Sequence, residues 1–251
     1  NAFIAFLIVC VLAGILLGLP LTGIVQSVNK GIGDTLGKLV ITIVLGAMLG
    51  KLVAESGAAK KIAAVLIKIF GKKYIAWAMV LAGFVIGIPL FYSVGFVLVI
   101  PLIFSVVYES KLPAIATGLP MLAALSVTHG FLPPHPSPVA LIEKFHADTG
   151  ITLLCGIIVS IPAIIIAGPL FASFLKNIPS QPLGLFKPQD VEEKKLPGTF
   201  NSFITASLPV CLIILFTVLK YIFTEPGNIK DIITFVGEPS VIMLVSLLIA
   251  L

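Results

Sequence analysis

Two histidines lie in a stretch of the chain that is otherwise apolar and free of formal charge. His129 and His135 fall between Ser126 and Pro138, a segment that also contains four prolines. Imidazole changes its charge near neutral pH more readily than any other side chain, so these rings are suited to binding and releasing a proton. Titratable rings and an interrupted backbone are costly at membrane depth. Their presence together therefore indicates a functional site.

Hydroxyl groups and a proline pair accompany the two rings. Thr128 precedes the pair Pro133 and Pro134, and Ser137 follows it. Because proline has no backbone N–H, carbonyls before this break lose their helical donors. The pattern predicts a polar pocket that holds an anionic or hydroxylated ligand, as broken helices do in secondary transporters.

A packing role is the alternative for each histidine. His129 is expected within a helix, where its ring would bond to a carbonyl of a neighbouring span. His135 stands between prolines, outside regular helix. The packing role therefore suits His129 better, and a role in transport suits His135 better.

A second candidate site lies at Tyr92 and Ser93, within an uncharged run from Tyr74 to Tyr108. As one helix this run would be roughly 52 Å long, against a membrane core of about 30 Å. Pro89 and flanking glycines interrupt its middle. We therefore predict a re-entrant helical hairpin over 74–108, with one tilted and kinked helix as the alternative. At its tip, backbone amides at the positive end of a half-helix would face a carboxylate.

The composition assigns the chain to membrane proteins. Of 251 residues, 59% are hydrophobic and 11% are charged, whereas soluble domains carry about 25% charged residues. At about 20 residues for each crossing, the length allows roughly six to eight crossings. The predicted fold class is an all-α polytopic membrane protein, with spanning helices, one re-entrant hairpin and one broken helix.

We predict three parts along the chain. Residues 1–175 form a first transmembrane repeat, which contains the hairpin at 74–108 and the broken helix at 112–146. Residues 176–200 form a cytoplasmic linker, and residues 201–251 begin a second repeat. Because the chain ends within an apolar run, we expect it to be a fragment.

The spans and loops follow from the apolar runs and the lysines. Spans are expected at 3–19, 36–53, 151–175, 202–223 and 232–251, with a polar loop at 20–35 and an amphipathic interfacial helix at 55–73. The last span is expected to be interrupted early, at Glu238 and Pro239. Lysines concentrate at 51–73 and 176–195. The positive-inside rule places these segments in the cytoplasm and the loops at 20–35, 143–150 and 224–231 outside.

Other function classes find little support. The sequence contains no HExxH zinc motif, nucleophile elbow or phosphate-binding glycine loop. The histidines have no carboxylate or thiol close by in sequence, so neither a metal site nor a cofactor is predicted. The net charge of +5 comes from lysines in short loops, which argues against nucleic-acid binding. Cys10, Cys155 and Cys211 lie in apolar segments and are expected to be packed thiols.

Three segments carry a resemblance to a known family. They read GDTLGKLVITIVLGAMLGKLVAESGAAKKIA at 33–63, FYSVGFVLVIPLIFSV at 91–106 and LSVTHGFLPPHPSPVA at 125–140. The chain resembles the gluconate permease family of gluconate:proton symporters, within the ion transporter superfamily. The resemblance implies a first repeat with the start of an inverted second one. It also implies that the hairpin tip and the broken helix bind substrate and coupling ion and move together against a scaffold.

The predicted site therefore consists of Tyr92, Ser93, Thr128, His129, Pro133, Pro134, His135 and Ser137. Many family members carry an acidic residue where this chain has Ser93, so its absence shifts proton coupling toward His129 or His135. The implied partners are a small organic anion, protons and the lipid bilayer of the bacterial inner membrane, and a homo-oligomer is compatible with the resemblance.

The predicted function is proton-coupled symport of gluconate or a related sugar acid. One alternative is transport of another small hydroxy or amino acid, such as idonate or D-serine. Two others are a membrane-embedded enzyme that uses His129 and His135, and a structural membrane subunit.

Overall fold

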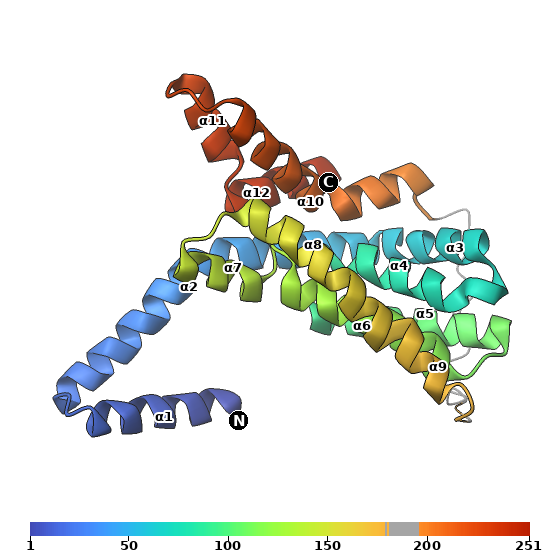
Figure 1. Cartoon of the computed structure of the whole chain (residues 1–251), viewed down its shortest axis with the longest axis horizontal. Helices are drawn as coiled ribbons and strands as arrows, with labels where there is room; N and C mark the ends of the chain where they lie inside the picture. Colours follow the sequence, from blue (N-terminus) through green and yellow to red (C-terminus); the bar gives the residue numbers. More distant parts are fainter. Residues whose placement is uncertain (179, 181–195) are drawn as a thin grey trace. The chain divides into compact units, whose positions relative to one another are not determined.

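The part of the chain that the computed structural model describes, residues 1–178, 180 and 196–251, consists of helices joined by short connections (Figure 1). No strand occurs in that part, so the all-α prediction is confirmed. The chain divides into two compact units, Asn1–Ile41 and Thr42–Leu251. Most of the predicted linker at 176–200 lies outside the described residues.

The first unit contains α1 (Ala2–Leu16) and the beginning of α2 (Leu21–Glu55). Gly18 adopts a left-handed conformation, with φ of 71°, where the chain turns between the two helices. The prediction of a polar loop at 20–35 is wrong, because these residues belong to α2. No proline follows Pro20 until Pro89, and scattered glycines weaken a helix without ending it.

The second unit is built around α6 (Ala114–Phe131). Two other helices, α4 (Ile75–Gly87) and α5 (Tyr92–Ser110), each pack against α6 and much less against one another. Gly83 permits the closest approach between α4 and α6, because a Cβ atom there would overlap the Met121 carbonyl oxygen of α6. The two arms of the predicted hairpin are thus joined mainly through a third helix.

The segment before α4 forms α3 (Ala58–Phe70) and a short 3₁₀ turn, η1 (Lys72–Tyr74). The predicted amphipathic helix is present, but its apolar face is covered by protein rather than left for a membrane surface. Ile62 and Ala63 are fully buried, and α3 packs against α4 and α10 (Thr199–Ile222). The alternation of lysines and aliphatic residues predicts one apolar face but does not say what covers that face.

The helix expected at 112–146 is interrupted as predicted. It comprises α6 and α7 (Pro136–Phe145), separated at Leu132 to His135. Leu132 is extended, with φ of −107° and ψ of 124°, because the residue before a proline avoids helical dihedrals. Pro136 begins α7, a position where its missing N–H costs no helical bond.

The span expected at 151–175 is not a uniform α-helix. It comprises α8 (Thr149–Ile165), a π-helical turn η2 (Ile166–Leu170) and α9 (Phe171–Leu175). The π turn contains Pro169, and a proline inside a helix removes one bond and displaces a preceding carbonyl.

The span expected at 232–251 is interrupted near Glu238 and Pro239, as predicted, and its helical part begins earlier, at Asn228. The chain forms α11 (Asn228–Val236) and α12 (Pro239–Ala250), whose axes differ by 70°. Pro239 cannot continue the ladder of α11 but is suited to the first position of a new helix.

Several helices are long and apolar enough to cross a membrane. Three candidate spans cover Ala114–Phe145, Thr149–Leu175 and Thr199–Ile222, and the number reaches six if each bent helix pair is one span. These counts apply to the described residues, where they support a polytopic membrane protein.

Candidate functional site

Two helix breaks meet in the second unit. The connection between α4 and α5 comprises residues 88–91, and the connection between α6 and α7 comprises residues 132–135. His135 Nε2 lies 2.9 Å from the carbonyl oxygen of Gly87, at the end of α4. This hydrogen bond joins the predicted hairpin tip to the predicted broken helix.

His129 and His135 form a pair. Their Nδ1 atoms lie 3.2 Å apart and their ring centroids 4.7 Å apart. His135 is buried, with 4% of its surface exposed, whereas His129 is half-buried. The histidine that bonds to a carbonyl of another helix is therefore His135, not His129 as its helical setting suggested.

Phe91 covers the histidine pair and was missed in the sequence. Its ring centroid lies 6.0 Å from that of His129 and 6.1 Å from that of His135, both in edge-on arrangements. It precedes α5 in an extended conformation, with φ of −61° and ψ of 143°. The one available signal was its place beside Tyr92 and Ser93 in the predicted tip, but an apolar ring gives no hint of contact with imidazoles.

Three glycines allow the two breaks to approach so closely. A Cβ atom on Gly87 would lie 3.0 Å from Thr128 Cβ, and one on Gly95 would lie 2.8 Å from a methyl of Leu125. A Cβ atom on Gly50 would lie 2.8 Å from the Pro89 carbonyl oxygen. The backbone at the site is thus fitted between α2 and α6 with no room for additional atoms.

Thr128 has a structural hydrogen bond. It is fully buried, and its Oγ1 donates to the Ala124 carbonyl oxygen at 2.6 Å, one turn earlier in α6. The structure therefore places its hydroxyl hydrogen inside the helix. Pro133 and Pro134 are buried beside it and are joined by a cis peptide bond.

The remaining predicted site residues lie at the starts of α5 and α7. Tyr92 is half-buried against the main hydrophobic core, and its ring contacts that of Phe96 at a centroid distance of 6.0 Å. Ser93 and Ser137 are both exposed. The structure thus joins Phe91, His129 and His135 in direct contact, with the two serines on the surface nearby in the chain.

The described residues contain no group of three or more histidine, cysteine or acidic side chains arranged for a metal ion. The expectation that the cysteines are packed is wrong, because Cys10, Cys155 and Cys211 are all exposed in the chain. An apolar residue pattern places a cysteine within a helix, but it does not show which side of that helix is covered.

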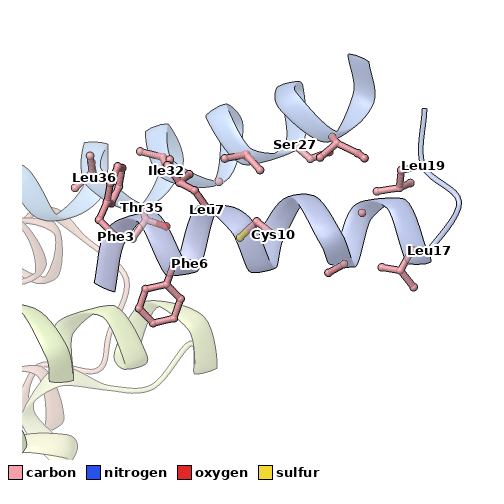
Figure 2. A pocket seen from close by; sticks show the side chains of 15 residues that line it. Phe3, Phe6, Leu7, Cys10, Leu17, Leu19, Ser27, Ile32, Thr35 and Leu36 are labelled. Carbon is pink, nitrogen blue, oxygen red and sulfur yellow. The ribbon is translucent and has the colours of Figure 1, made fainter. Parts of the chain in front are cut away.

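A separate groove lies within the first unit, between α1 and the start of α2 (Figure 2). Its volume is about 870 Å³, and apolar side chains such as Phe3, Leu7 and Ile32 line most of it. Ser27 and Thr35 are the hydroxyl residues in this lining. The groove has no charged lining residue and differs in character from the histidine site.

The whole chain, residues 1–251, matches the family described as GntP family permease. It is 43% identical to the "Gnt-II system L-idonate transporter" and to a "High-affinity gluconate transporter", both of Escherichia coli (strain K12), and to the "Gluconate permease" of Bacillus subtilis (strain 168). Each alignment covers 100% of this chain and 57–58% of the relative. No solved structure matches.

Proposed function

Because the chain belongs to the GntP permease family over its whole length, we propose that it contributes to a secondary active transporter that carries gluconate or a related sugar acid together with protons. The chain spans a little over half of the relatives named above, so the activity is that of the complete protein. The observation that carries the proposal is the bond between His135 and the Gly87 carbonyl, which unites both helix breaks at one site.

The N-terminus of α5 is better suited to bind a substrate carboxylate than the N-terminus of α7. The first amides of a helix have no acceptor within it, and they lie at the positive end of the helix dipole. In α5 these are the amides of Tyr92, Ser93 and Val94, since the first helical bond runs from the Gly95 amide to the Phe91 carbonyl. Three adjacent N–H groups suit an anion.

The N-terminus of α7 offers different hydrogen-bonding groups. Pro136 and Pro138 have no N–H, so Ser137 supplies the one amide of this first turn. Its exposed hydroxyl can both donate and accept a hydrogen bond. We assign this end of the site to a substrate hydroxyl, which a sugar acid offers along its carbon chain.

The histidine pair supplies the proton-binding group. It lies against Phe91, the residue immediately before α5. A proton on an imidazole next to the carboxylate site would offset the substrate's negative charge in a medium of low polarity. This arrangement gives a physical reason for coupling a proton to an anion.

The substrate class rests on the relatives. Proteins named for gluconate and for L-idonate transport are equally similar to this chain, so idonate is the leading alternative substrate and D-serine a more distant one. An enzyme using His129 and His135 is set aside, because the relatives are named as permeases and transporters.

The architecture expected from the sequence forms part of the proposal. Residues 74–108 would form a re-entrant hairpin and 1–175 a first repeat, followed by a cytoplasmic linker at 176–200. Residues 201–251 would begin an inverted second repeat. Hairpin and broken helix would move together in a bacterial inner membrane, in a protein that is compatible with homo-oligomer formation.

Transport by the complete protein in proteoliposomes tests the proposal. We expect labelled gluconate to accumulate unchanged when the outside is made acidic, and to stop accumulating when a protonophore removes the gradient. Unlabelled idonate should compete more strongly than D-serine. Chemical conversion of gluconate without a gradient would instead support an enzyme, and absence of uptake would support a structural subunit.

A further inference from the structure

We propose that the histidine pair binds one transported proton, and that this proton binds to Nε2 of His129. His135 is a positioning residue, because its hydrogen bonds leave a free lone pair on that nitrogen in the neutral pair. The inference rests on the proposed function and deepens it. It assigns the two rings different tasks and fixes the number of protons that accompany one substrate anion.

The bond to Gly87 determines the tautomer of His135. A carbonyl oxygen can only accept, so the contact of 2.9 Å requires a hydrogen on His135 Nε2. A neutral imidazole carries one N–H, and the Nδ1 atom of His135 therefore has a free lone pair. Burial of this ring at 4% exposure keeps water from replacing the carbonyl.

The tautomer of His129 follows from that of His135. The two Nδ1 atoms lie 3.2 Å apart, and a hydrogen bond between them needs one donor and one acceptor. Since His135 Nδ1 accepts, His129 Nδ1 carries the hydrogen. The neutral His129 ring then has its free lone pair on Nε2, the atom farther from its partner.

A proton from water can bind to that lone pair without breaking any existing bond. His129 becomes a cation that donates from both nitrogens, its Nδ1 still donates to His135, and His135 still donates to Gly87. A second proton would have to bind His135 Nδ1, which would place two N–H groups against each other. The pair therefore accepts one proton and resists a second.

The helices that pack around the pair carry few ionisable residues near it. α12 meets the break through Ile242, which packs in one cluster with Leu132, and the ionisable residue nearest on that element is Glu238 at its N-cap. α4 contains no ionisable residue, and on α5 the nearest one is Tyr92, whose ring contacts Phe96. On α7, Glu143 is eight residues beyond His135, about 12 Å along the helix axis. On α2, Lys51 and Glu55 pair with each other at 3.7 Å. On α8, the ionisable residue nearest Gly156, which packs against Phe131, is the exposed Cys155.

One proton on the pair makes the loaded site electrically neutral. A sugar acid carries one negative charge, which His129 in its protonated form cancels. The empty site with a neutral pair is neutral as well. A proton alone or an anion alone would leave a net charge in an apolar setting, which is costly. We therefore infer electroneutral transport of one proton with one monoanion.

Nitrogen NMR of the complete protein in lipid bilayers tests the tautomers without any transport assay. Histidines labelled with ¹⁵N in the ring are assigned by comparison with His129→Gln and His135→Gln, and with His146→Gln as an exposed control outside the pair. At alkaline pH we expect protonated Nδ1 and bare Nε2 in His129, and the reverse in His135. On acidification His129 Nε2 should gain a proton while His135 keeps its neutral signals. Protonation of His135 first, or a bare Nδ1 in His129, would overturn the inference.

Transport in proteoliposomes tests the stoichiometry. We expect a pH gradient to drive gluconate accumulation and a potassium–valinomycin membrane potential alone to drive none. His129→Gln should lose the proton movement that accompanies uptake, whereas His135→Gln should retain it with a shifted pH midpoint, since a glutamine can still donate to the Gly87 carbonyl. Accumulation driven by potential alone would overturn the one-proton inference and leave the proposed function intact. Absence of gluconate uptake would instead remove the proposed function, and the NMR signals would then decide the inference.

Discussion

His135 donates a hydrogen bond from Nε2 to the Gly87 carbonyl oxygen at 2.9 Å, across 48 residues of sequence. Both partners lie where a helix is interrupted, so the bond satisfies a carbonyl at the end of α4 that has no helical donor. It also holds the His135 ring against His129. A single side chain thereby connects the backbone of one break to the titratable group of the other.

The first prediction concerns the relative stability of two histidine variants. His135→Ala should lower the free energy of unfolding by about 1–3 kcal/mol, because it leaves the Gly87 carbonyl without a partner in a buried setting. His129→Ala should lower the free energy of unfolding by less, since this ring is half-buried and its hydrogen bond is to His135. Thermal unfolding of the purified protein in detergent gives the order. A greater loss for His129→Ala would show that its helical packing, not the Gly87 bond, is the dominant contribution.

The second prediction concerns the closest contact between α4 and α6. Gly83→Ala should destabilise the protein by about 1–3 kcal/mol, because its Cβ atom would overlap the Met121 carbonyl oxygen and force the helices apart. Gly37→Ala is the matched control within α2, since a Cβ atom there meets nothing within 4 Å. That control should gain up to about 1 kcal/mol from helix propensity. Equal melting temperatures for the two variants would contradict the packing.

The third prediction concerns the aromatic cover of the histidine pair. Phe91→Ala should reduce pH-driven uptake more than Phe96→Ala, because Phe91 contacts both imidazoles and Phe96 contacts Tyr92. Phe96 is a suitable control, since it is an aromatic residue of the next turn and is 39% exposed. Initial uptake rates, corrected for the amount of folded protein, give the comparison. Equal losses would mean that the covering ring has no special part in the site.

The fourth prediction concerns orientation in the membrane. We expect Asn228→Cys to react with an impermeant thiol reagent from outside and Lys72→Cys to remain unlabelled until the membrane is opened. Both positions are exposed in the structure. Because the three native cysteines of this chain are also exposed, they are first replaced by serine. The reverse labelling pattern would show that the number of crossings between these positions is wrong.

The sequence predicts where the helices are interrupted better than what lies across each interruption. Prolines at 89 and 133–134 mark the breaks because proline lacks a backbone donor, and both breaks occur there. The bond from His135 to Gly87 could not be predicted in the same way, because it depends on how α4 packs against α6. Phe91 was missed for this reason, since its contact with the imidazoles comes from packing and not from residue chemistry.

The errors in the fold predicted from the sequence have a common physical origin. The segment 20–35 contains polar residues and glycines, which indicated a loop, yet it is helical because no proline interrupts it. The amphipathic pattern of α3 was correct, but its apolar face meets protein. Residue patterns thus report local preference and one-sided burial, whereas the partner of each face is decided by tertiary packing.

The last prediction tests the carboxylate site at the start of α5. Ser93 is the second residue of this helix and is exposed. Ser93→Asp places a negative charge at the positive end of the helix, which should stabilise the fold by about 0.3–1 kcal/mol. The family resemblance implies an acidic residue at this position in many members, so a carboxylate bound to these amides is a feature of a chain that lacks that acid. The Asp charge would repel a substrate carboxylate by about 4 kcal/mol at 4 Å separation. Since 1.4 kcal/mol corresponds to a factor of ten in affinity, we expect KM for gluconate to rise at least roughly tenfold.

Ser240→Asp is the matched control for this charge, because Ser240 is the second residue of α12, directly after Pro239. It introduces the same residue at the second position of another helix, so an effect of the added charge on folding would appear in both variants, whereas a rise in KM from a lost carboxylate site would appear in Ser93→Asp alone. Uptake kinetics and thermal unfolding measured on both variants separate binding from folding. An unchanged KM for a folded Ser93→Asp protein would mean that the carboxylate does not bind at the start of α5, and the carboxylate site would then have to be sought at Ser137, where one amide and one hydroxyl begin α7.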